Sequence, residues 1–264
     1  MGEAYGRRLS FSPPRRWIND FLHFARQVPT VPVQKRMTVA ALKAAREECD
    51  SRPSWVSLFA KAYALVAAKR PELRRVYLGF PWAHQYEHPT SVVSIAIERR
   101  VADEDCVFFT QIRGPEELTP EQLDRVLAHC KEVPIEQFGI FRRAMRISRL
   151  PGPLRRLSWW MALNLSGYYR ARNVGTFGVS VYSSLGAESL HPLSLMTTTL
   201  NYGVIADDGT VDVRIIYDHR ILNGATVART LNELEETLNH QLPPLLVSPP
   251  RPSLSSSRPV PAKG

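Results

Sequence analysis

The chain has 264 residues, with 34 Lys and Arg against 25 Asp and Glu, which gives a formal net charge of +9. At 44% hydrophobic and 22% charged residues, the composition is that of a globular protein with a sizeable core. This balance excludes a disordered, collagen-like or disulfide-dense chain.

The positive charge is local. Residues 141–173 contain eight arginines and no acidic residue, and the tail 243–264 adds three basic residues, so the remainder carries a net charge of about −2. No helix-turn-helix, zinc-finger or RNA-binding motif accompanies the charge, and we therefore expect no nucleic-acid partner.

The three cysteines, Cys49, Cys106 and Cys130, are far apart and form no CxxC pair, which argues against a disulfide framework and a structural zinc site. We expect reduced thiols in a cytoplasmic protein. The N-terminus has no apolar signal-peptide core, and no apolar run is long enough to span a membrane.

Taken in chain order, the periodicity predicts an α+β domain with no repeat. The predicted helices cover 14–27, 40–49, 54–69, 119–131 and 225–240, and the predicted strands cover 30–39, 90–98, 106–112, 176–182, 197–205 and 211–217. The tail 243–264 holds seven of the 21 prolines and is predicted to be disordered.

The arginine-rich segment predicts a basic amphipathic helix after the breaker Pro151-Gly152-Pro153. Apolar residues recur at helical spacing at Leu154, Leu157, Met161, Leu165 and Tyr168. One interpretation packs this stripe on the body and leaves the arginines in solvent. The alternatives are a surface for ligand phosphates, for an acidic carrier protein or for an anionic membrane.

The strongest candidate for chemistry is the run from Ile216 to Ala225, in which His219 follows a strand and precedes a glycine turn into a helix. A histidine on such a rigid edge can act as a general base, although a turn histidine is also commonly a hydrogen-bonded structural residue. The remaining histidines form no close ligand pair on a helix, so we expect no metal site.

A second candidate is the strand from Gly175 that ends in Ser183-Ser184-Leu185-Gly186. Either serine could donate a hydrogen bond to an oxyanion, but Ser-Ser-x-Gly is also an ordinary turn.

Together, Y-D-H-R-x-x-N-G-A and the preceding S-S-L-G resemble the catalytic domain of the 2-oxoacid dehydrogenase acyltransferases (dihydrolipoamide acyltransferase, the E2 component). PTVPVQKRMTVAALKAARE, SWVSLFAKAYALVAAKRPELRRVY and SVVSIAIE resemble the family's first strand and helix, its long helix and the following strand. The resemblance covers residues 15–242 and implies a chloramphenicol acetyltransferase-like fold, a mixed sheet flanked by helices.

By carry-over, His219 is the general base that deprotonates an acceptor thiol, and Ser183 donates to the tetrahedral oxyanion. Asn223 stands where the family commonly has Asp, so it keeps a hydrogen-bonding role without the charge. The resemblance further implies a homotrimer, with His219 of one subunit facing Ser183 of its neighbour.

The family's lipoyl-bearing domain has no counterpart here, so we expect residues 1–14 to be an N-terminal extension, 15–242 the catalytic domain and 141–173 a basic insertion. The expected substrate is coenzyme A as acyl-CoA, or a carrier-protein thioester, with Arg155 and Arg156 binding phosphates or an acidic acyl carrier or lipoyl-type carrier. The alternatives are a non-catalytic trimeric scaffold and a peripheral membrane enzyme acting on lipid.

Overall fold

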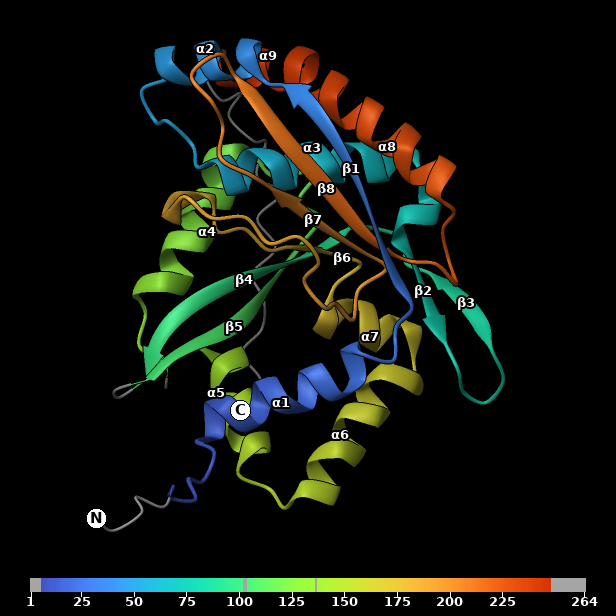
Figure 1. Ribbon diagram of the computed structural model, residues 1–264. Helices are drawn as coiled ribbons and strands as arrows, with labels where there is room; N and C mark the ends of the chain where they lie inside the picture. The colour runs from blue at the N-terminus through green and yellow to red at the C-terminus, as the bar shows by residue number, and fades with distance from the viewer. Residues whose placement is uncertain (1–5, 102–103, 136, 248–264) are drawn as a thin grey trace, which may run out of the picture.

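The computed structural model describes residues 6–101, 104–135 and 137–247. A mixed six-stranded sheet runs through it, in the strand order β1-β8-β7-β6-β4-β5, and a separate hairpin is formed by β2 and β3 (Figure 1). The strands are β1 (Thr30–Thr38), β2 (Arg75–Leu78), β3 (His84–Glu87), β4 (Val92–Val101), β5 (Glu104–Arg113), β6 (Phe177–Val179), β7 (Thr198–Tyr202) and β8 (Thr210–Asp218). β6 pairs in parallel with β4 and β7, and the other neighbours in the sheet are antiparallel.

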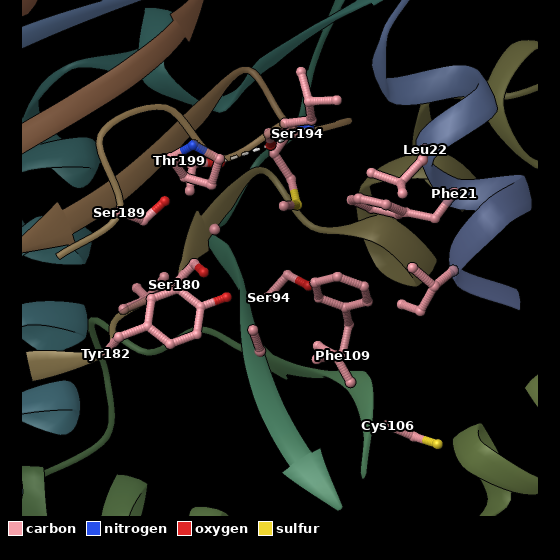
Figure 2. A pocket seen from close by; sticks show the side chains of 18 of the residues that line it. Phe21, Leu22, Ser94, Cys106, Phe109, Ser180, Tyr182, Ser189, Ser194 and Thr199 are labelled. Atoms are coloured by element: carbon pink, nitrogen blue, oxygen red, sulfur yellow. Dashed lines mark hydrogen bonds between the residues drawn. The ribbon is translucent and has the colours of Figure 1, made fainter. Parts of the chain in front are cut away.

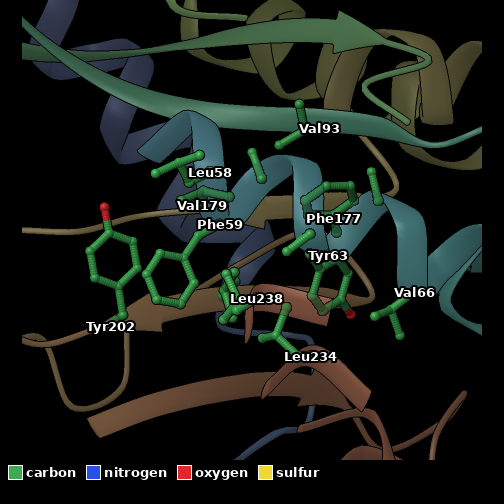
Figure 3. Packing of buried hydrophobic residues seen from close by; sticks show 14 of the residues in the cluster. Leu58, Phe59, Tyr63, Val66, Val93, Phe177, Val179, Tyr202, Leu234 and Leu238 are labelled. Carbon is green, nitrogen blue, oxygen red and sulfur yellow. The ribbon is translucent and has the colours of Figure 1, made fainter. Parts of the chain in front are cut away.

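One face of the sheet is covered by helices that bury the main core. They are α2 (Ala40–Glu48), α3 (Trp55–Lys69), α4 (Pro120–Glu132), α8 (Gly224–Glu236) and α9 (Pro243–Val247), with a π-helical turn over Thr237–Gln241. On α3, Phe59 stacks on Tyr202 with ring centroids 4.1 Å apart, and Tyr63 packs on Phe177 at 4.6 Å (Figure 3). Burial of each side chain of this size contributes about 2 kcal/mol to the free energy of unfolding, so the packing of α3 on the sheet is a main source of stability.

Four further helices cover the other face of the sheet beside β4 and β5, and we call them the helical cap. They are α1 (Pro13–Ala25), α5 (Gly139–Ser148), α6 (Gly152–Asn164) and α7 (Gly167–Val174) (Figure 1). Trp159 of α6 packs on α1, with its ring centroid 4.5 Å from that of Trp17 and 6.4 Å from that of Phe21. The N-terminal helix and the arginine-rich segment therefore form one layer.

The structure confirms the predicted strands and most of the predicted helices, with boundaries that shift by a few residues. The β2–β3 hairpin is not among the predicted elements. Disorder from residue 243 is wrong for Pro243–Val247, which form α9 against α2. The remainder of that tail lies outside the described residues. In the described part of the chain, no helix is long and apolar enough to cross a membrane.

The single amphipathic helix expected around 154–168 is wrong in two respects. Ser166 caps a new helix, so α6 ends at Asn164 and α7 begins at Gly167. The expected stripe also faces solvent: Leu154, Leu157 and Leu165 are 50 to 55% exposed. The inward side of α6 consists instead of Trp159 and Leu163, which pack with α1. The interpretation in which the stripe packs on the body is therefore wrong.

Candidate active site

A cavity of about 280 Å³ lies on the cap side of the sheet, and six of the residues that line it carry hydroxyl groups. The alternation of strand side chains places them there. Gly178 of β6 pairs with Ser94 of β4 on one side and Thr199 of β7 on the other, and Ser180 follows Gly178 at a spacing of two. Figure 2 shows Ser94, Ser180, Tyr182, Ser194 and Thr199 around this space. We call it the serine cavity.

The hydroxyls of the serine cavity differ in how they are held. Thr199 Oγ1 donates to Ser194 Oγ at 2.6 Å, and Gln111 Nε2 donates to Ser94 Oγ at 3.3 Å. The backbone N–H of Ser180 donates to the Leu200 carbonyl at 3.2 Å, and its carbonyl accepts from the Asn201 side chain. Within the described residues, the Ser180 hydroxyl makes no hydrogen bond, so it is available to a ligand.

Ser183 begins a short 3-10 turn beyond this strand, over Ser183–Leu185, and does not line the serine cavity. Burial raises the pKa of the Tyr202 phenol, and the neighbouring Ser183 side chain lowers it by a smaller amount. Ser183 is half-buried and lies beside Tyr202, which is packed in the core on Phe59.

His219 follows the last residue of β8. Its backbone N–H donates to the Pro29 carbonyl at 3.0 Å, and the adjoining Asp218 N–H donates to Thr197 at 2.8 Å. The histidine is exposed, its ring lies 5.4 Å from the Tyr217 ring, and the described residues offer the imidazole no hydrogen bond. The backbone is thus fixed while the imidazole stays free for a substrate.

Charged neighbours stiffen this end of β8. The Arg220 guanidinium grips the buried carboxylate of Asp218, with one contact of 2.6 Å and another of 2.9 Å, and stacks 4.0 Å over the Tyr77 ring. Asn223 is exposed at the N-cap position of α8, and its side chain makes no capping hydrogen bond. Its amide therefore remains available beside the turn that carries His219.

His219 and Ser180 lie far apart within one chain. Their strands, β8 and β6, flank β7 on opposite sides, about 10 Å from each other. The hydrogen bonds to Thr197 and Leu200 place the two residues a further three positions apart along β7, another ~10 Å. Ser183 lies beyond Ser180 on the same side, so neither serine reaches the imidazole of its own chain.

The two arginines expected to bind substrate differ in their surroundings. Arg155 Nε donates to Asp20 Oδ2 at 2.6 Å, and Arg155 also donates to the Leu150 carbonyl at 3.1 Å. Arg156 is exposed. A third arginine of the segment, Arg170, is buried and donates to the backbone carbonyls of Tyr77, Leu163 and Leu195. Part of the arginine-rich segment therefore holds the cap on the sheet.

Cys106 also lines the serine cavity. Burial, with a further contribution from Glu104, raises the pKa of its thiol, which disfavours the nucleophilic thiolate. Over the described ranges, no three His, Cys, Asp or Glu side chains cluster in a way that could hold a metal ion.

The site thus combines a mixed sheet, a histidine at the end of a strand and a cavity that is partly lined by hydroxyl groups. Neither the models of known protein families nor the curated proteins give a match to this chain. Solved structures do match it, and the matches show its fold.

A probable dihydrolipoamide acetyltransferase from Listeria monocytogenes is similar with a TM-score of 0.64 and 18% identity, over 88% of this chain and 94% of that one. The Azotobacter vinelandii dihydrolipoamide acetyltransferase gives 0.64 and 16%, over 90% and 93%. The core of the 2-oxoacid dehydrogenase multienzyme complex from Thermoplasma acidophilum gives 0.64 and 15%, over 89% and 99%. The chain thus has the fold of the dihydrolipoamide acyltransferase catalytic cores, as the resemblance implied.

Sequence reasoning selected Ser183 and missed Ser180. A signal for Ser180 was present, because Phe177-Gly178-Val179-Ser180 alternates with period two and the buried Phe177 and Val179 assign Ser180 to the opposite face. The helical cap that covers this face was not predictable in this way, because it forms by packing of α1 on helices more than a hundred residues further along the chain.

Proposed function

We propose that this protein is an acyltransferase that moves an acyl group from a CoA-type or carrier-protein thioester to a thiol, amine or hydroxyl acceptor. The observation that carries the proposal is His219, fixed by its backbone at the end of β8 with an exposed, unpaired imidazole, in a chain with this fold. The Azotobacter enzyme uses a serine, a histidine and an asparagine, and the last two are four residues apart, as are His219 and Asn223.

The chemistry uses few groups. The His219 imidazole takes the proton of the acceptor as the acceptor attacks the thioester carbonyl, and a tetrahedral oxyanion forms. A serine hydroxyl donates a hydrogen bond to that oxyanion. When the intermediate collapses, the carbon–sulfur bond breaks and the leaving thiolate recovers the proton from the imidazolium, so that His219 returns to its neutral state.

Ser180 is the better placed oxyanion donor of the two serines. Its hydroxyl lines the serine cavity and is unpaired within the described residues, whereas Ser183 does not line that cavity. Both serines lie in the run between Gly175 and Gly186 that carries part of the resemblance. Parallel Ser180→Ala and Ser183→Ala variants decide between them.

The working unit is a trimer in which His219 of one subunit meets the serine cavity of the next. The separation of His219 and Ser180 in one chain supports this proposal, because the two residues can then meet only across a contact between subunits. Large apolar residues around the serine turn are exposed in the single subunit, as expected of a contact surface: Tyr182, Leu185, Leu190, Leu193 and Val204.

The test measures formation of CoA and of the acylated acceptor by chromatography, from acetyl-CoA and longer acyl-CoAs, with dihydrolipoamide as the first acceptor. We expect turnover by the wild-type protein and a loss of at least 100-fold in His219→Ala, with His240→Ala, an exposed histidine on another element, as the matched control. Unchanged turnover in an assembled His219→Ala protein contradicts the assignment. A trimer that releases CoA from no thioester supports the non-catalytic scaffold.

One observation favours a second candidate, a peripheral membrane enzyme acting on lipid. The outward side of α6 carries Leu154, Leu157 and Met161, followed by Leu165, and these side chains are 41 to 55% exposed. Exposed apolar residues beside arginines suit an anionic lipid surface. Co-sedimentation with phosphatidylserine vesicles that is lost in Leu154→Ser/Leu157→Ser and weakened in Arg156→Glu supports it, and no co-sedimentation of the wild type removes it.

A further inference from the structure

A second cavity, of about 320 Å³, lies between the helical cap and the sheet. We call it the cap cavity. Its walls are largely aromatic, with Trp17 and Phe21 from α1, Phe108 and Phe109 from β5, Phe141 from α5 and Trp159 from α6. The volume is at the lower end of the range for small-molecule sites. Phe21, Ser94, Phe109 and Met196 line both cavities, so the cap cavity adjoins the serine cavity.

The charged side chains that line the cap cavity are all positive. Arg113 of β5, Arg143 of α5 and Arg172 of α7 line it, and no acidic residue of the described chain does. Arg113 and Arg143 are exposed, and the described residues form no ion pair with either. These two guanidinium groups therefore stand at the solvent side of an aromatic cavity with their charge uncompensated.

Trp159 adds a buried donor. Its side chain lines the cap cavity, the residue is only 8% exposed, and its indole Nε1–H has no hydrogen-bond partner within the described residues. A buried N–H without a partner is unfavourable by about 1–3 kcal/mol, and most such groups in folded proteins are satisfied. A ligand oxygen in the cavity would satisfy it.

From these observations we propose that the cap cavity binds an apolar carboxylate, a medium-length acyl or aryl-alkyl acid. The aromatic walls enclose the hydrocarbon part, the arginines bind the carboxylate, and an oxygen atom accepts from Trp159. This site goes beyond the acyl-transfer proposal and does not depend on it, because it needs neither His219 nor a neighbouring subunit.

Decanoate is the probe, and Trp17 and Trp159 in the cavity wall give an intrinsic fluorescence signal for titration. We expect saturable binding of decanoate, binding at least about tenfold weaker for uncharged 1-decanol, and none for acetate, which lacks the apolar part. Calorimetric titration gives the stoichiometry, which we expect to be one per chain.

Two pairs of variants locate the ligand. Arg143→Gln should weaken decanoate binding about tenfold, while Arg146→Gln, on the same helix but outside the cavity, should leave it unchanged. Ala162→Phe should fill the cavity and abolish binding, while Met161→Phe, the same ring on the outward side of α6, should not. Thermal unfolding identifies any variant that fails to fold.

Absence of saturable decanoate binding to the wild type overturns the proposal, as does equal binding by Arg143→Gln and Ala162→Phe in folded protein. Equal affinity for decanoate and 1-decanol overturns the assignment of the carboxylate to the arginines. Each result is independent of turnover, so failure of this site and failure of the acyl-transfer proposal are distinguishable.

Discussion

Arg155 of α6 and Asp20 of α1 form a nearly buried ion pair, with Nε and Oδ2 2.6 Å apart and side chains 15% and 5% exposed. The two residues are 135 positions apart in the chain. The pair turns Arg155 inward and so leaves Leu154 and Leu157 on the outside of α6. It also fixes α6 relative to α1, and these two helices form walls of the cap cavity.

Asp20→Ala should destabilise the protein by about 3 kcal/mol, because a nearly buried Arg155 loses its counter-charge. The measurement is urea unfolding followed by tryptophan fluorescence. Arg156→Gln, which changes the exposed neighbour, should stay within about 0.5 kcal/mol of the wild type. A similar small effect for Asp20→Ala would show that the pair does not hold the cap.

Gly175 provides a backbone test of the link between α7 and β6. Its φ is +109°, and a Cβ built there lies 2.9 Å from the Ser94 Cβ and 3.1 Å from the Val92 carbonyl oxygen. Gly175→Ala should therefore cost about 1–3 kcal/mol or more of the free energy of unfolding. Gly152→Ala, with open space around the new Cβ, is the matched control and should be neutral or slightly stabilising. Equal stability of the two variants would contradict the geometry.

The Arg70–Glu233 pair makes part of the stability depend on pH. Arg70 Nε donates to Glu233 Oε2 at 2.7 Å, and this hydrogen bond lowers the pKa of the carboxyl below its ordinary value of 4.5. A depressed carboxyl pKa gives stability that is fully present well above pH 4.5 and is lost as the pH falls through the lower, folded-state value.

Glu233→Gln should remove that dependence. We expect the free energy of unfolding to fall by at most about 1 kcal/mol at pH 7, because the pair is partly exposed. At pH 3 the variant and the wild type should differ by less. Guanidine unfolding at pH 7, 5 and 3 measures it. If the difference in the free energy of unfolding between variant and wild type grew on acidification, the proposed pH dependence of this pair would be wrong.

The sheet and the main core were predictable because their signals are local. Thr119-Pro120-Glu121, an N-cap residue followed by a first-turn proline and an acid, predicts the start of α4. The structure has the full capping box between Thr119 and Gln122. The alternating strands 90–98 and 106–112 became the β4–β5 hairpin. The final helix after Gly224 was likewise correct in type and place.

The cap was not predictable, because long-range contacts decide its arrangement. The apolar spacing of Leu154, Leu157 and Leu165 favoured an inward stripe, but Trp159 packing on Trp17 and the Arg155–Asp20 pair rotate α6 the other way. In the same way, only the tertiary structure shows that Ser180 lines one cavity with Ser94 and Thr199, whereas the motif indicated Ser183.

Ser180→Ala should lower the rate of acyl transfer by about 100- to 1,000-fold if its hydroxyl is the oxyanion donor. Ser183→Ala should have a smaller effect on the rate, since Ser183 does not line the serine cavity, and should leave the free energy of unfolding within about 0.5 kcal/mol of the wild type. Steady-state rates and unfolding curves of both variants check this. The opposite order of rates would assign the role to Ser183.

Mixing subunits tests whether the site forms between chains. His219→Ala and Ser180→Ala proteins should each be nearly inactive, but a Ser180→Ala subunit still supplies His219 and a His219→Ala subunit still supplies Ser180. After co-refolding in equal amounts, random assembly of a cyclic trimer restores about one quarter of the wild-type sites. Mixtures of either variant with the double variant should recover nothing. If recovery is no greater than in those mixtures, His219 and Ser180 do not form a site between subunits. Because their separation across β7 also keeps them from meeting within one chain, the proposed trimeric site would then be wrong.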